Sequence, residues 1–574
     1  MENINSWQDI QWSTIETIVF RLQLRIFKAA TAQEWQKVHK LQKLLISSQS
    51  AKYLAVKRVT QDNSGKKTPG VDNHIISSPE ERFILATQLK IDGKSSPIRR
   101  TYIPKPDGSQ RPLGIPTITD RAKQSLAYLA LCPEWEAQFE AGSYGFRPGR
   151  SVHDAIEAVF LGICKKPKWV LDADISKCFD RINHKYLLEK CHTFPEMERQ
   201  LRTWLKAGIL DGGNYAFPEL GTPQGGIISP LLANIALHGL RDDLDKYINQ
   251  LPGHKANNRQ SLTYIRYADD FILMHPNKEV IEELQSITTK FLEPVGLELH
   301  PTKTRIVHTF ELYHDPPGFT FLGFDVIQKP IWKKMRTVGG GKESKQAFTT
   351  LITPSRESVR KHKLKIRDVI RRNRGASQER LIQNLNPIIR GWALSKRTQI
   401  SSKTFQALDA YLFIHLWKWA KKRHPKMPRS QLKSRYWHTV NQANWVFGVQ
   451  TSPENMEGPN LCLQSHSKIP IQRHAKVKGT ASPFDGNLIY WAARTGKNPL
   501  IPPIKARLIQ QQKGLCGICG QPFRPDDLIE RDHIIPKALG GLNKRSNVHA
   551  VHRHCHLDKT RQEMAAIRQI RNKF

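Results

Sequence analysis

The stretch Tyr-Ala-Asp-Asp-Phe (YADDF, residues 267–271) places two adjacent carboxylates inside a hydrophobic run. Apolar, aromatic and β-branched residues lead into it from Leu262 and continue after it to Met274. This composition predicts strand–turn–strand. An ionised carboxylate is costly to desolvate without a compensating partner, so the pair indicates a site that binds cations. On this stretch alone, an Asp-Asp hairpin turn in solvent is an equal alternative.

A second apolar run, WVLDAD (residues 169–174), carries further carboxylates and predicts another strand. Positions two apart on a strand share a face. Asp172 and Asp174 are therefore expected to point the same way, with Val170 on the same face. The chain between the two runs alternates short strand-like and helical patterns from about residue 95 to residue 325, which is typical of an α/β or α+β domain.

Length and charge limit the class of protein. The chain has 574 residues, beyond the roughly 250–300 at which single cores stop growing, so we expect several domains. Its 89 Lys and Arg residues against 51 Asp and Glu give a formal charge of +38, which predicts a nucleic-acid partner. No run approaches the ~18 apolar residues of a spanning helix, and the first residues lack a secretory pattern. We expect a reducing cytoplasmic compartment and no membrane partner.

Several motifs resemble those of reverse transcriptases. Asp174 followed by Phe179 resembles the first metal-binding motif of that family, and YADD (267–270) resembles the second. The turn and helix that contact substrate in the family resemble GTPQGGIISPLLANI (221–235). The other blocks follow in the family's order: RRTYIPKPDGSQRPLGIPTITDR (99–121), SYGFRPGRSVHDAI (143–156), Gly296-Leu297, Lys303-Thr304 and FLGF (321–324).

The resemblance implies a role for individual residues. Nucleotidyl transfer uses two divalent cations about 3.5–4 Å apart, and Mg²⁺ prefers oxygen ligands. Asp174 and Asp269 would be the principal ligands of two Mg²⁺ ions. Asp270 is the second carboxylate of the Asp-Asp pair. The residues expected to contact incoming dNTPs or other substrate groups are Lys105, Arg111, Phe179, Gln224 and Lys303. Arg147 and Arg150 are expected to contact template or substrate. Taken singly, each basic residue is more often a solvated charge.

The accessory regions narrow the family. TPGVD (68–72), RPLGIPT (111–117) and LNPIIRGWA (385–393) resemble group II intron-encoded proteins. That resemblance implies two roles: binding a group II intron RNA and helping it to fold and splice, and copying that RNA into DNA at a target site. It also implies a bacterial protein that joins the nucleoid when bound to target DNA. Two alternatives stay open. One is an RNA-folding cofactor with relic catalytic motifs, and the other is a reverse transcriptase from another retroelement with a borrowed nuclease.

The C-terminal module carries a second group of motifs. Cys516, Cys519, His552 and Cys555 form two pairs with two-residue spacers, which favours a structural zinc site. The alternative for His552 is an ordinary core histidine. Interleaved with these residues is an HNH nuclease pattern: Asp532-His533, Asn547 and His556. Its expected chemistry uses a base and one divalent ion.

The HNH pattern assigns roles within the module. His533 is the expected base, because a neutral imidazole accepts a proton near pH 7. Asp532 and His556 would hold the divalent ion, and Asn547 would orient His533. Gly540-Gly541 is expected to supply the turn between the hairpin and the following helix. The module is small for a hydrophobic core, so zinc is expected to stabilise it.

The expected fold class is multidomain α+β: a right-hand polymerase (fingers and palm) with a helical thumb/X domain, a basic DNA-binding segment and a zinc-stapled ββα-metal (HNH) module. The expected units are 1–95 (N-terminal extension and start of the fingers), 96–325 (fingers and palm), 326–430 (thumb/X or maturase domain), 431–505 (DNA-binding segment) and 506–574 (HNH endonuclease). A structural linker is the alternative for 431–505. We predict helices at residues 1–60, 355–375 and 381–420. The helix at 355–375 would either lie along a phosphate backbone or form a solvated basic face. Residues 336–346 are predicted to form an exposed loop.

Overall fold

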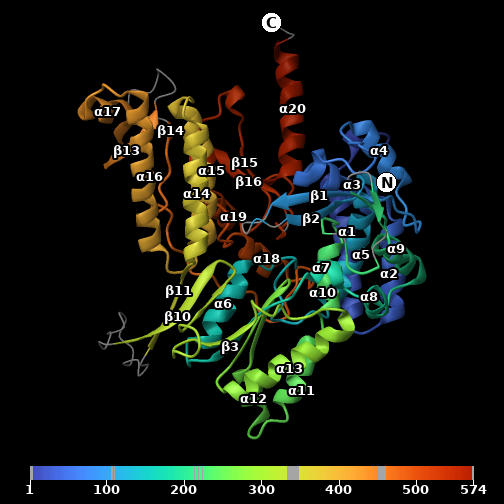
Figure 1. Ribbon diagram of the computed structural model, residues 1–574. Helices are drawn as coiled ribbons and strands as arrows, with labels where there is room; N and C mark the ends of the chain where they lie inside the picture. The colour runs from blue at the N-terminus through green and yellow to red at the C-terminus, as the bar shows by residue number, and fades with distance from the viewer. Residues whose placement is uncertain are drawn as a thin grey trace.

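The structure is a computed structural model (Figure 1). It describes residues 4–571 except 105–107, 109, 212–213, 217–218, 223, 332–347, 441, 450–460 and 526. Lys105 and the loop predicted at 336–346 lie outside the described residues. Within the described part of the chain, no helix is long and apolar enough to cross a bilayer.

A four-stranded antiparallel sheet lies at the centre of the polymerase-like region. Its strand order is β6-β7-β3-β8, and its strands are β3 (Trp169–Asp174), β6 (Thr263–Tyr267), β7 (Asp270–His275) and β8 (Arg305–His308). Alternate residues face different cores: Leu171 and Ala173 join one hydrophobic cluster, and Val170 joins another. Helix α13 (Lys278–Val295) packs with the first cluster, and α6 (Val152–Ile163) with the second. The predicted strand–turn–strand at YADDF is confirmed as β6, a two-residue turn and β7.

The N-terminal residues form the predicted helices. α1 (Trp12–Thr31), α2 (Trp35–Ser47) and α3 (Gln49–Lys57) pack on α5 (Ile118–Glu136) around a shared apolar core. A second sheet, of order β2-β1-β4-β5, follows. Its strands are β1 (Ile98–Pro104), β2 (Gln110–Ile115), β4 (Ile209–Asp211) and β5 (Asn214–Ala216). The remaining helices of this half are α4 (Pro79–Gln88), α7 (Cys178–Arg181), α8 (His184–Cys191), α9 (Pro195–Leu205), α10 (Ser229–Ala236), α11 (Leu240–Ile248) and α12 (Lys255–Ser261).

A small sheet leads from the central sheet to a helical bundle. β9 (Phe319–Phe321), β10 (Phe324–Pro330) and β11 (Phe348–Pro354) are antiparallel neighbours. The bundle contains α14 (Arg356–Arg372), α15 (Gln378–Lys396) and α16 (Ser402–Arg423), and α17 (Arg429–Tyr436) with strands β12 (Trp437–Val440), β13 (Ala443–Val449) and β14 (Leu461–Cys462) adds to it. α17 and β13 share its core through Leu432 and Phe447. The helices predicted at 355–375 and 381–420 are confirmed.

The chain then returns to the central sheet before entering the C-terminal module. Gln472 N donates to Arg397 O at 3.0 Å, and Val477 N donates to Asp154 Oδ1 at 2.8 Å. α18 (Leu488–Thr495) places Trp491 in the core beside α6. The module follows as α19 (Pro503–Gln511), β15 (Ile529–His533), β16 (Val548–His552) and α20 (Arg553–Arg571). Much of the predicted DNA-binding segment is thus engaged in contacts within the chain.

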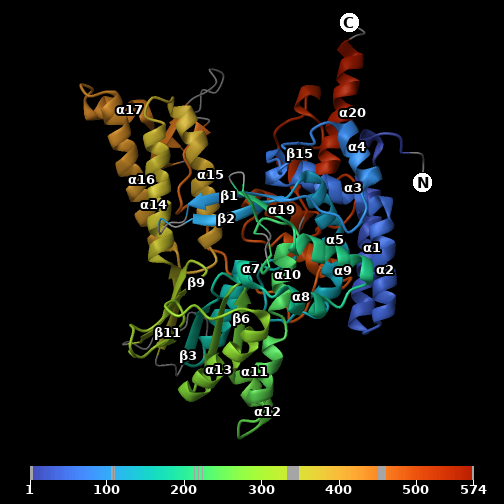
Figure 2. The same cartoon turned by 45° about the vertical axis from the view of Figure 1, so that its right-hand side comes forward.

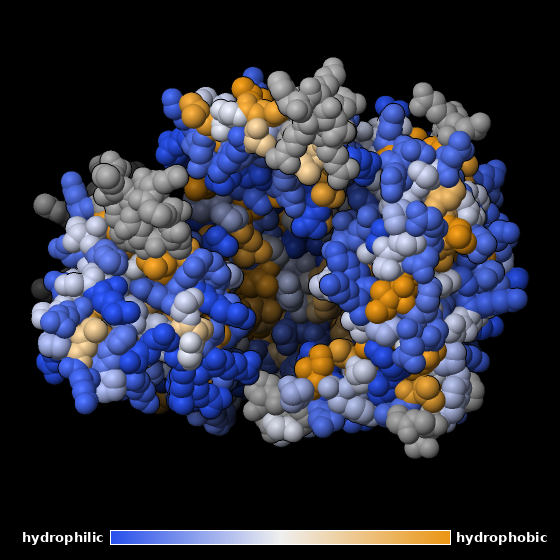
Figure 3. Space-filling view, turned by 90° about the horizontal axis from the view of Figure 1, so that it is seen from above, coloured by the Kyte–Doolittle hydropathy of each residue, from blue (hydrophilic) through white to orange (hydrophobic). Residues whose placement is uncertain are grey.

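Three of the expected unit boundaries fall inside elements: 325/326 in β10, 430/431 in α17 and 505/506 in α19. The bundle helices α14–α17 stand on one side of the molecule and the N-terminal helices on the other, with α20 beside the latter (Figures 1 and 2). Seen from above, the surface is deeply hollowed between these two sides, and the rim is largely hydrophilic (Figure 3).

Candidate active sites and metal centre

The structure brings together the three carboxylates of the first candidate site. Asp174 ends β3 and lies opposite Asp270, the first residue of β7, in the antiparallel register. Asp269 occupies the turn between β6 and β7, after Ala268 with φ 59°. The backbone geometry therefore concentrates negative charge at one end of the central sheet.

The proximity of these groups changes their acidity. Burial and then the charges of Asp269 and Asp174 raise the pKa of Asp270 to about 7. Burial and Asp174 also raise the pKa of Asp269, although Arg111 and Lys303 act in the opposite direction. Like charges held close together disfavour ionisation. An all-oxygen donor set with this repulsion fits Mg²⁺, which takes carboxylate ligands and neutralises them.

Basic side chains approach this cluster from two directions. Lys303 Nζ lies 2.7 Å from Asp174 Oδ2. Arg305 Nε lies 3.2 Å from Asp172 Oδ2, so the carboxylate two residues before Asp174 is paired with a cation. Arg111 lies on the neighbouring sheet, exposed on β2, and acts electrostatically on Asp269.

The predicted substrate turn packs between the two sheets. Gln224 O accepts a hydrogen bond from Gly114 N of β2 at 2.6 Å. A Cβ on the next residue, Gly225 (φ 118°), would lie 2.5 Å from Gly114 O, so only glycine fits. Phe179 on α7 makes an edge-to-face contact with Phe146, with ring centroids 6.2 Å apart. Gln224 and Phe179 are thus held by contacts with β2 and with the loop before α6.

The loop at 142–147 makes main-chain contacts with the end of β6 and with the Asp-Asp turn. The sequence motifs did not reveal these contacts. Tyr144 N donates to Arg266 O and Arg266 N donates to Gly142 O, both at 2.8 Å. A Cβ on Gly145 would lie 2.2 Å from Ala268 N. The two backbones therefore touch directly beside Asp269, and Gly145 permits the approach.

A buried guanidinium lies beneath the same turn. Arg266, only 1% exposed, donates to Asn234 Oδ1 at 3.0 Å and to Tyr264 Oη at 3.1 Å. Its Nη2 lies 3.8 Å from Glu140 Oε2. Burial raises the pKa of Glu140, but the hydrogen bond of His238 and the charge of Arg266 outweigh it and hold that pKa at about 2. The charge pair thus fixes the strand that leads into YADD.

The prediction that Arg147 and Arg150 contact template or substrate is wrong for their positions here. Arg147 is buried and paired with Glu136 at 2.8 Å, and it also donates to two main-chain carbonyls. Arg150 is buried as well and donates to the carbonyls of Ala141, Gly479 and Ala481. Glu136 and nearby carbonyls bind Arg147, and the carbonyls of Ala141, Gly479 and Ala481 bind Arg150, so both side chains are structural.

The second candidate site is a ββα unit. β15 and β16 pair in antiparallel register from Ile529 to His533, and α20 begins directly after β16. Asp532 on β15 and His556 on α20 face each other, with His556 Nε2 3.5 Å from Asp532 Oδ1. His556 Nδ1 lies 2.8 Å from Glu530 Oε2. A carboxylate on the second nitrogen of a histidine is the usual support of a metal ligand, so this pair fits a divalent ion.

Two further side chains of this unit were not anticipated from the sequence. Asp532 Oδ2 accepts from Lys559 Nζ at 2.7 Å and lies 3.1 Å from His549 Nε2. Burial raises the pKa of Asp532, but the hydrogen bonds of Lys559 and His549 outweigh it and lower that pKa. His549 lies opposite Asp532 in the β15–β16 register, whereas Lys559 reaches Asp532 from α20, and the HNH pattern includes neither residue.

Two expectations about this unit need correction. Asn547 does not orient the side chain of His533. Instead, His533 Nε2 lies 3.2 Å from Asn543 Oδ1, while the Asn547 amide bonds the main chain of Ile535 and Leu542. Gly540-Gly541 lies between β15 and β16, not between the hairpin and α20. A Cβ on Gly541 would lie 1.9 Å from Ile535 O, so these glycines and Asn547 close the long hairpin loop.

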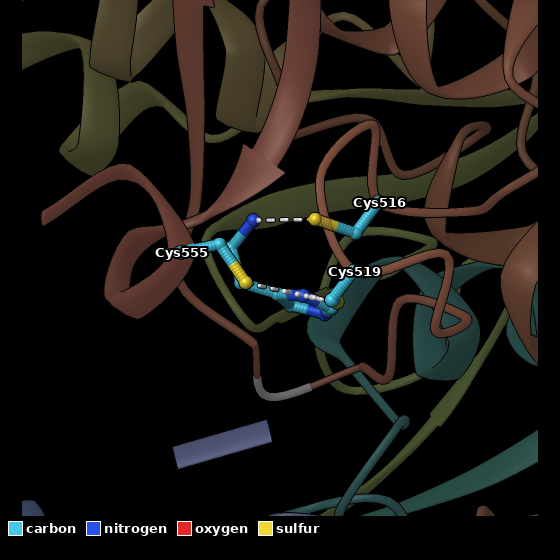
Figure 4. A group of neighbouring side chains, drawn as sticks. Cys516, Cys519 and Cys555 are labelled. Carbon is cyan, nitrogen blue, oxygen red and sulfur yellow. Dashed lines mark hydrogen bonds between the residues drawn. The ribbon is translucent and has the colours of Figure 1, made fainter. Parts of the chain in front are cut away.

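The candidate metal centre gathers the four predicted ligands (Figure 4). The ligand atoms of Cys516, Cys519, His552 and Cys555 lie within 4.8 Å of one another. His552 Nδ1 is 3.4 Å from Cys519 Sγ and 4.0 Å from Cys555 Sγ. Its Nε2 lies 3.2 Å from Asp527 Oδ2, the carboxylate support that zinc-bound histidines use. Three thiols and one imidazole in this arrangement fit tetrahedral zinc.

Four families match the chain in sequence. Residues 7–89 match the N-terminal domain of reverse transcriptase, and residues 103–326 match reverse transcriptase (RNA-dependent DNA polymerase). Residues 359–437 match the group II intron maturase-specific domain, and residues 516–562 match HNH endonuclease. A telomerase structure from Candida tropicalis overlaps 40% of this chain and 53% of its own at 14% identity, with a TM-score of 0.31, too low to support any argument.

Two curated relatives cover about half of the chain. Protein YkfC of Escherichia coli is 33% identical over 330 residues, which is 50% of this chain and 84% of YkfC. The group II intron-encoded protein LtrA of Lactococcus lactis is 30% identical over 371 residues, 52% of this chain and 58% of LtrA. With the four matched families in one chain and the carboxylate and ββα sites assembled, the protein belongs to the group II intron reverse transcriptases that carry a maturase domain and an HNH endonuclease.

Proposed function

We propose that the protein binds its group II intron RNA, assists the splicing of that RNA, and copies it into a DNA target by target-primed reverse transcription, a process called retrohoming. The observation that carries this proposal is the presence of two separate groups of side chains in one chain, each suited to phosphoryl transfer. One is the carboxylate cluster of β3 and the β6–β7 turn, and the other is the ββα unit. The maturase-specific match lies between them in sequence and supports binding of intron RNA.

The overall form supports a right-hand polymerase. The β6-β7-β3-β8 sheet would be the palm, the β2-β1-β4-β5 sheet with the N-terminal helices the fingers, and α14–α16 the thumb. The hollow between the bundle and the N-terminal side would receive nucleic acid (Figure 3). We retain the five units of the chain, with two boundaries moved to the ends of β10 and α17 and the third moved to the start of α19. Binding to target DNA would place the protein at the nucleoid.

In the polymerase site, Asp174, Asp269 and Asp270 would hold two Mg²⁺ ions. Bound there, the ions would stabilise charge on the attacking and leaving oxygens. Arg111, with Lys105, would bind the triphosphate of a dNTP by charge-assisted hydrogen bonds. Phe179 would pack against the sugar and exclude a 2′-hydroxyl, and Gln224 would fix the turn beside the nucleotide. Lys303, whose Nζ lies 2.7 Å from Asp174 Oδ2, would contact substrate at the edge of the cluster.

In the nuclease site, His533 would accept the proton of the attacking water, with Asn543 orienting its ring. Asp532 and His556 would hold one divalent ion, which would stabilise charge on the cleaved phosphate. Glu530 orients His556, and Lys559 adds positive charge beside Asp532. Zinc on Cys516, Cys519, His552 and Cys555 would hold the hairpin to the preceding turn.

The test separates the two sites. RNA that copurifies with the protein is sequenced to identify the intron, and the DNA that flanks the intron gene supplies the target sequence. His533→Ala should leave zinc content and RNA insertion into one strand unchanged but abolish nicking of the other strand. A pre-nicked target should restore cDNA synthesis, since the variant lacks only its primer. Undiminished second-strand nicking by zinc-replete His533→Ala protein would contradict the assignment of His533.

A further inference from the structure

The helical bundle carries a cluster of aromatic rings that the polymerase and nuclease sites do not use. We call it the aromatic platform: Phe413 and Trp417 on α16, Trp437 on β12 and Trp445 on β13. The ring centroids of Phe413 and Trp445 are 5.8 Å apart, and those of Trp417 and Trp437 are 5.2 Å apart. Trp437 is buried, but Phe413 is 39% exposed and Trp445 is 46% exposed. The platform is therefore anchored by a buried ring and presents Phe413 and Trp445 to solvent.

The backbone holds Trp445 in a strained conformation. The β12–β13 ladder pairs His438 with Val446 and Val440 with Ala443, so Asn444 and Trp445 together face Thr439 alone. Within this irregularity Trp445 has φ 61°, an uncommon conformation for a bulky residue. Such strain is typically retained where a side chain must point in a particular direction for function.

A basic side chain contacts the rings, and the surrounding sequence is rich in others. Lys433 Nζ lies 4.6 Å from the Trp445 ring centroid in a cation–π contact. Residues 411–449 contain five lysines and three arginines and no aspartate or glutamate. The basic residues are Lys418, Lys421, Lys422, Arg423, Lys426, Arg429, Lys433 and Arg435. Exposed aromatic faces beside cations bind single-stranded nucleic acid, because bases stack on the rings while phosphates pair with the cations.

We propose that the aromatic platform binds unpaired nucleotides of the intron RNA by stacking on Trp445 and Phe413. This inference rests on the proposed binding of intron RNA. Phe413, Trp417 and Trp437 all lie within the maturase-specific match of residues 359–437, which points to RNA as the occupant. Paired bases in an A-form helix keep their faces covered, whereas loops and bulges expose them. The platform thus selects unpaired bases, and the basic residues contribute affinity without sequence preference.

The experiment uses the full-length protein and a labelled single-stranded U-rich RNA oligonucleotide. Trp445→Ala should weaken binding roughly 5- to 150-fold, as expected for loss of one stacked base, and Trp445→Phe should restore most of it. The slope of log affinity against log salt should not change, because no charge is lost. Lys433→Gln should instead reduce that slope by about 1. Ile489→Ala, which truncates an 85% exposed residue on α18, is the matched control and should bind as wild type.

A crosslinking measurement on the wild type tests the platform without relying on the folding of any variant. Wild-type protein irradiated with 5-iodouridine RNA should yield adducts on Trp445 or Phe413, mapped by mass spectrometry. Equal binding by wild type and a folded Trp445→Ala protein, or equal losses with duplex RNA, would overturn the platform. A larger loss with single-stranded DNA than with RNA would overturn RNA as the occupant. Failure of the wild type to bind any RNA would instead remove the proposed function on which the inference rests.

Discussion

At the residue scale, the chemistry depends on carboxylates that the backbone holds together against their mutual repulsion. The strand at WVLDAD and the Asp269 turn were predictable, because both are local patterns, and the resemblance to reverse transcriptases implied that Asp174 and the YADD carboxylates share a site; the Asp174–Asp270 register itself came only from the structure. The roles of Arg147 and Arg150 were not, because their partners come from Glu136 and from the carbonyls of Gly479 and Ala481. A single sequence reveals a charged side chain but not which groups accept its hydrogen bonds in the fold.

Gly145 gives the sharpest prediction at the polymerase site. In Gly145→Ala the new Cβ would lie 2.2 Å from Ala268 N, so the turn that carries Asp269 must shift. A displacement of about 1 Å at a reacting group lowers rates roughly 100-fold, and we expect that loss in the rate of primer extension. Gly375→Ala is the control, since its Cβ would meet nothing within 4 Å. Full activity in Gly145→Ala would mean that the turn tolerates the shift.

Asp527 gives a prediction at the metal centre. It supports His552 through the imidazole nitrogen that faces away from the thiols. Loss of such a partner typically lowers metal affinity 10- to 100-fold, and we expect this range for Asp527→Ala in a zinc competition titration with a chelator. Asp527→Asn, which retains an acceptor, should fall between that variant and wild type. Wild-type zinc affinity in Asp527→Ala would show that the imidazole needs no carboxylate.

At the scale of elements, the helices followed from the sequence more readily than the sheets. The periodic patterns at 1–60, 355–375 and 381–420 correspond to helices in the structure. Strands β12–β14 were not anticipated, because 430–505 shows no periodicity and their pairing depends on the packing of Trp437 and Phe447 against the bundle. The expected boundaries inside β10 and α17 also depend on packing, because each of these elements packs with partners on both sides of the expected division.

The packing of α2 on α5 carries a buried acid whose titration should affect stability. Glu134, 3% exposed, accepts a hydrogen bond from Gln42 at 2.6 Å, and burial raises its pKa from 4.5 to about 7. The folded state therefore holds a proton that the unfolded state releases between about pH 4.5 and pH 7. Stability is fully present below that window and falls as pH rises through it, by up to about 3 kcal/mol.

Glu134→Gln tests this relation. The variant cannot ionise, so it should gain stability over wild type as pH rises from 5 to 8 and level off above pH 7. Thermal melting of both proteins across that range measures the difference. A pH-independent difference between them would show that Glu134 is already ionised in the folded protein.

At the scale of the whole molecule, the two ends of the chain meet. Glu16 of α1 lies 2.8 Å from Lys57 Nζ and 3.5 Å from His554 Nδ1 of the nuclease module. The Arg524 guanidinium lies 4.0 Å from the Phe20 ring centroid and donates to Glu16 O. A cavity of about 1230 Å³ opens between these surfaces. The family motifs lie within single domains, so this contact could not be predicted from them.

Replacing Glu16 should weaken the contact between the N-terminal helices and the nuclease module. Glu16→Gln removes the carboxylate 3.5 Å from His554 Nδ1 of α20. It also leaves the buried Lys57 of α3 without its charge partner, which destabilises the α1 helix that the module contacts by on the order of 3 kcal/mol. Limited proteolysis should therefore release the C-terminal module faster from Glu16→Gln than from wild type. Glu34→Gln, at an exposed pair with Lys37, is the control and should behave as wild type. Equal release from all three proteins would show that other contacts dominate the interface.

The most direct measurement of the central claim is primer extension by the purified full-length protein, with Mg²⁺ and dNTPs, on a homopolymer RNA template. The wild type should extend the DNA primer, whereas the Asp269→Asn/Asp270→Asn double variant should not, although it should still retain the copurifying intron RNA and assist its splicing. Absence of extension by a folded, RNA-bound wild type that still assists splicing would contradict the account and favour an RNA-folding cofactor. Equal extension by wild type and the double variant would contradict the assignment of the carboxylate cluster.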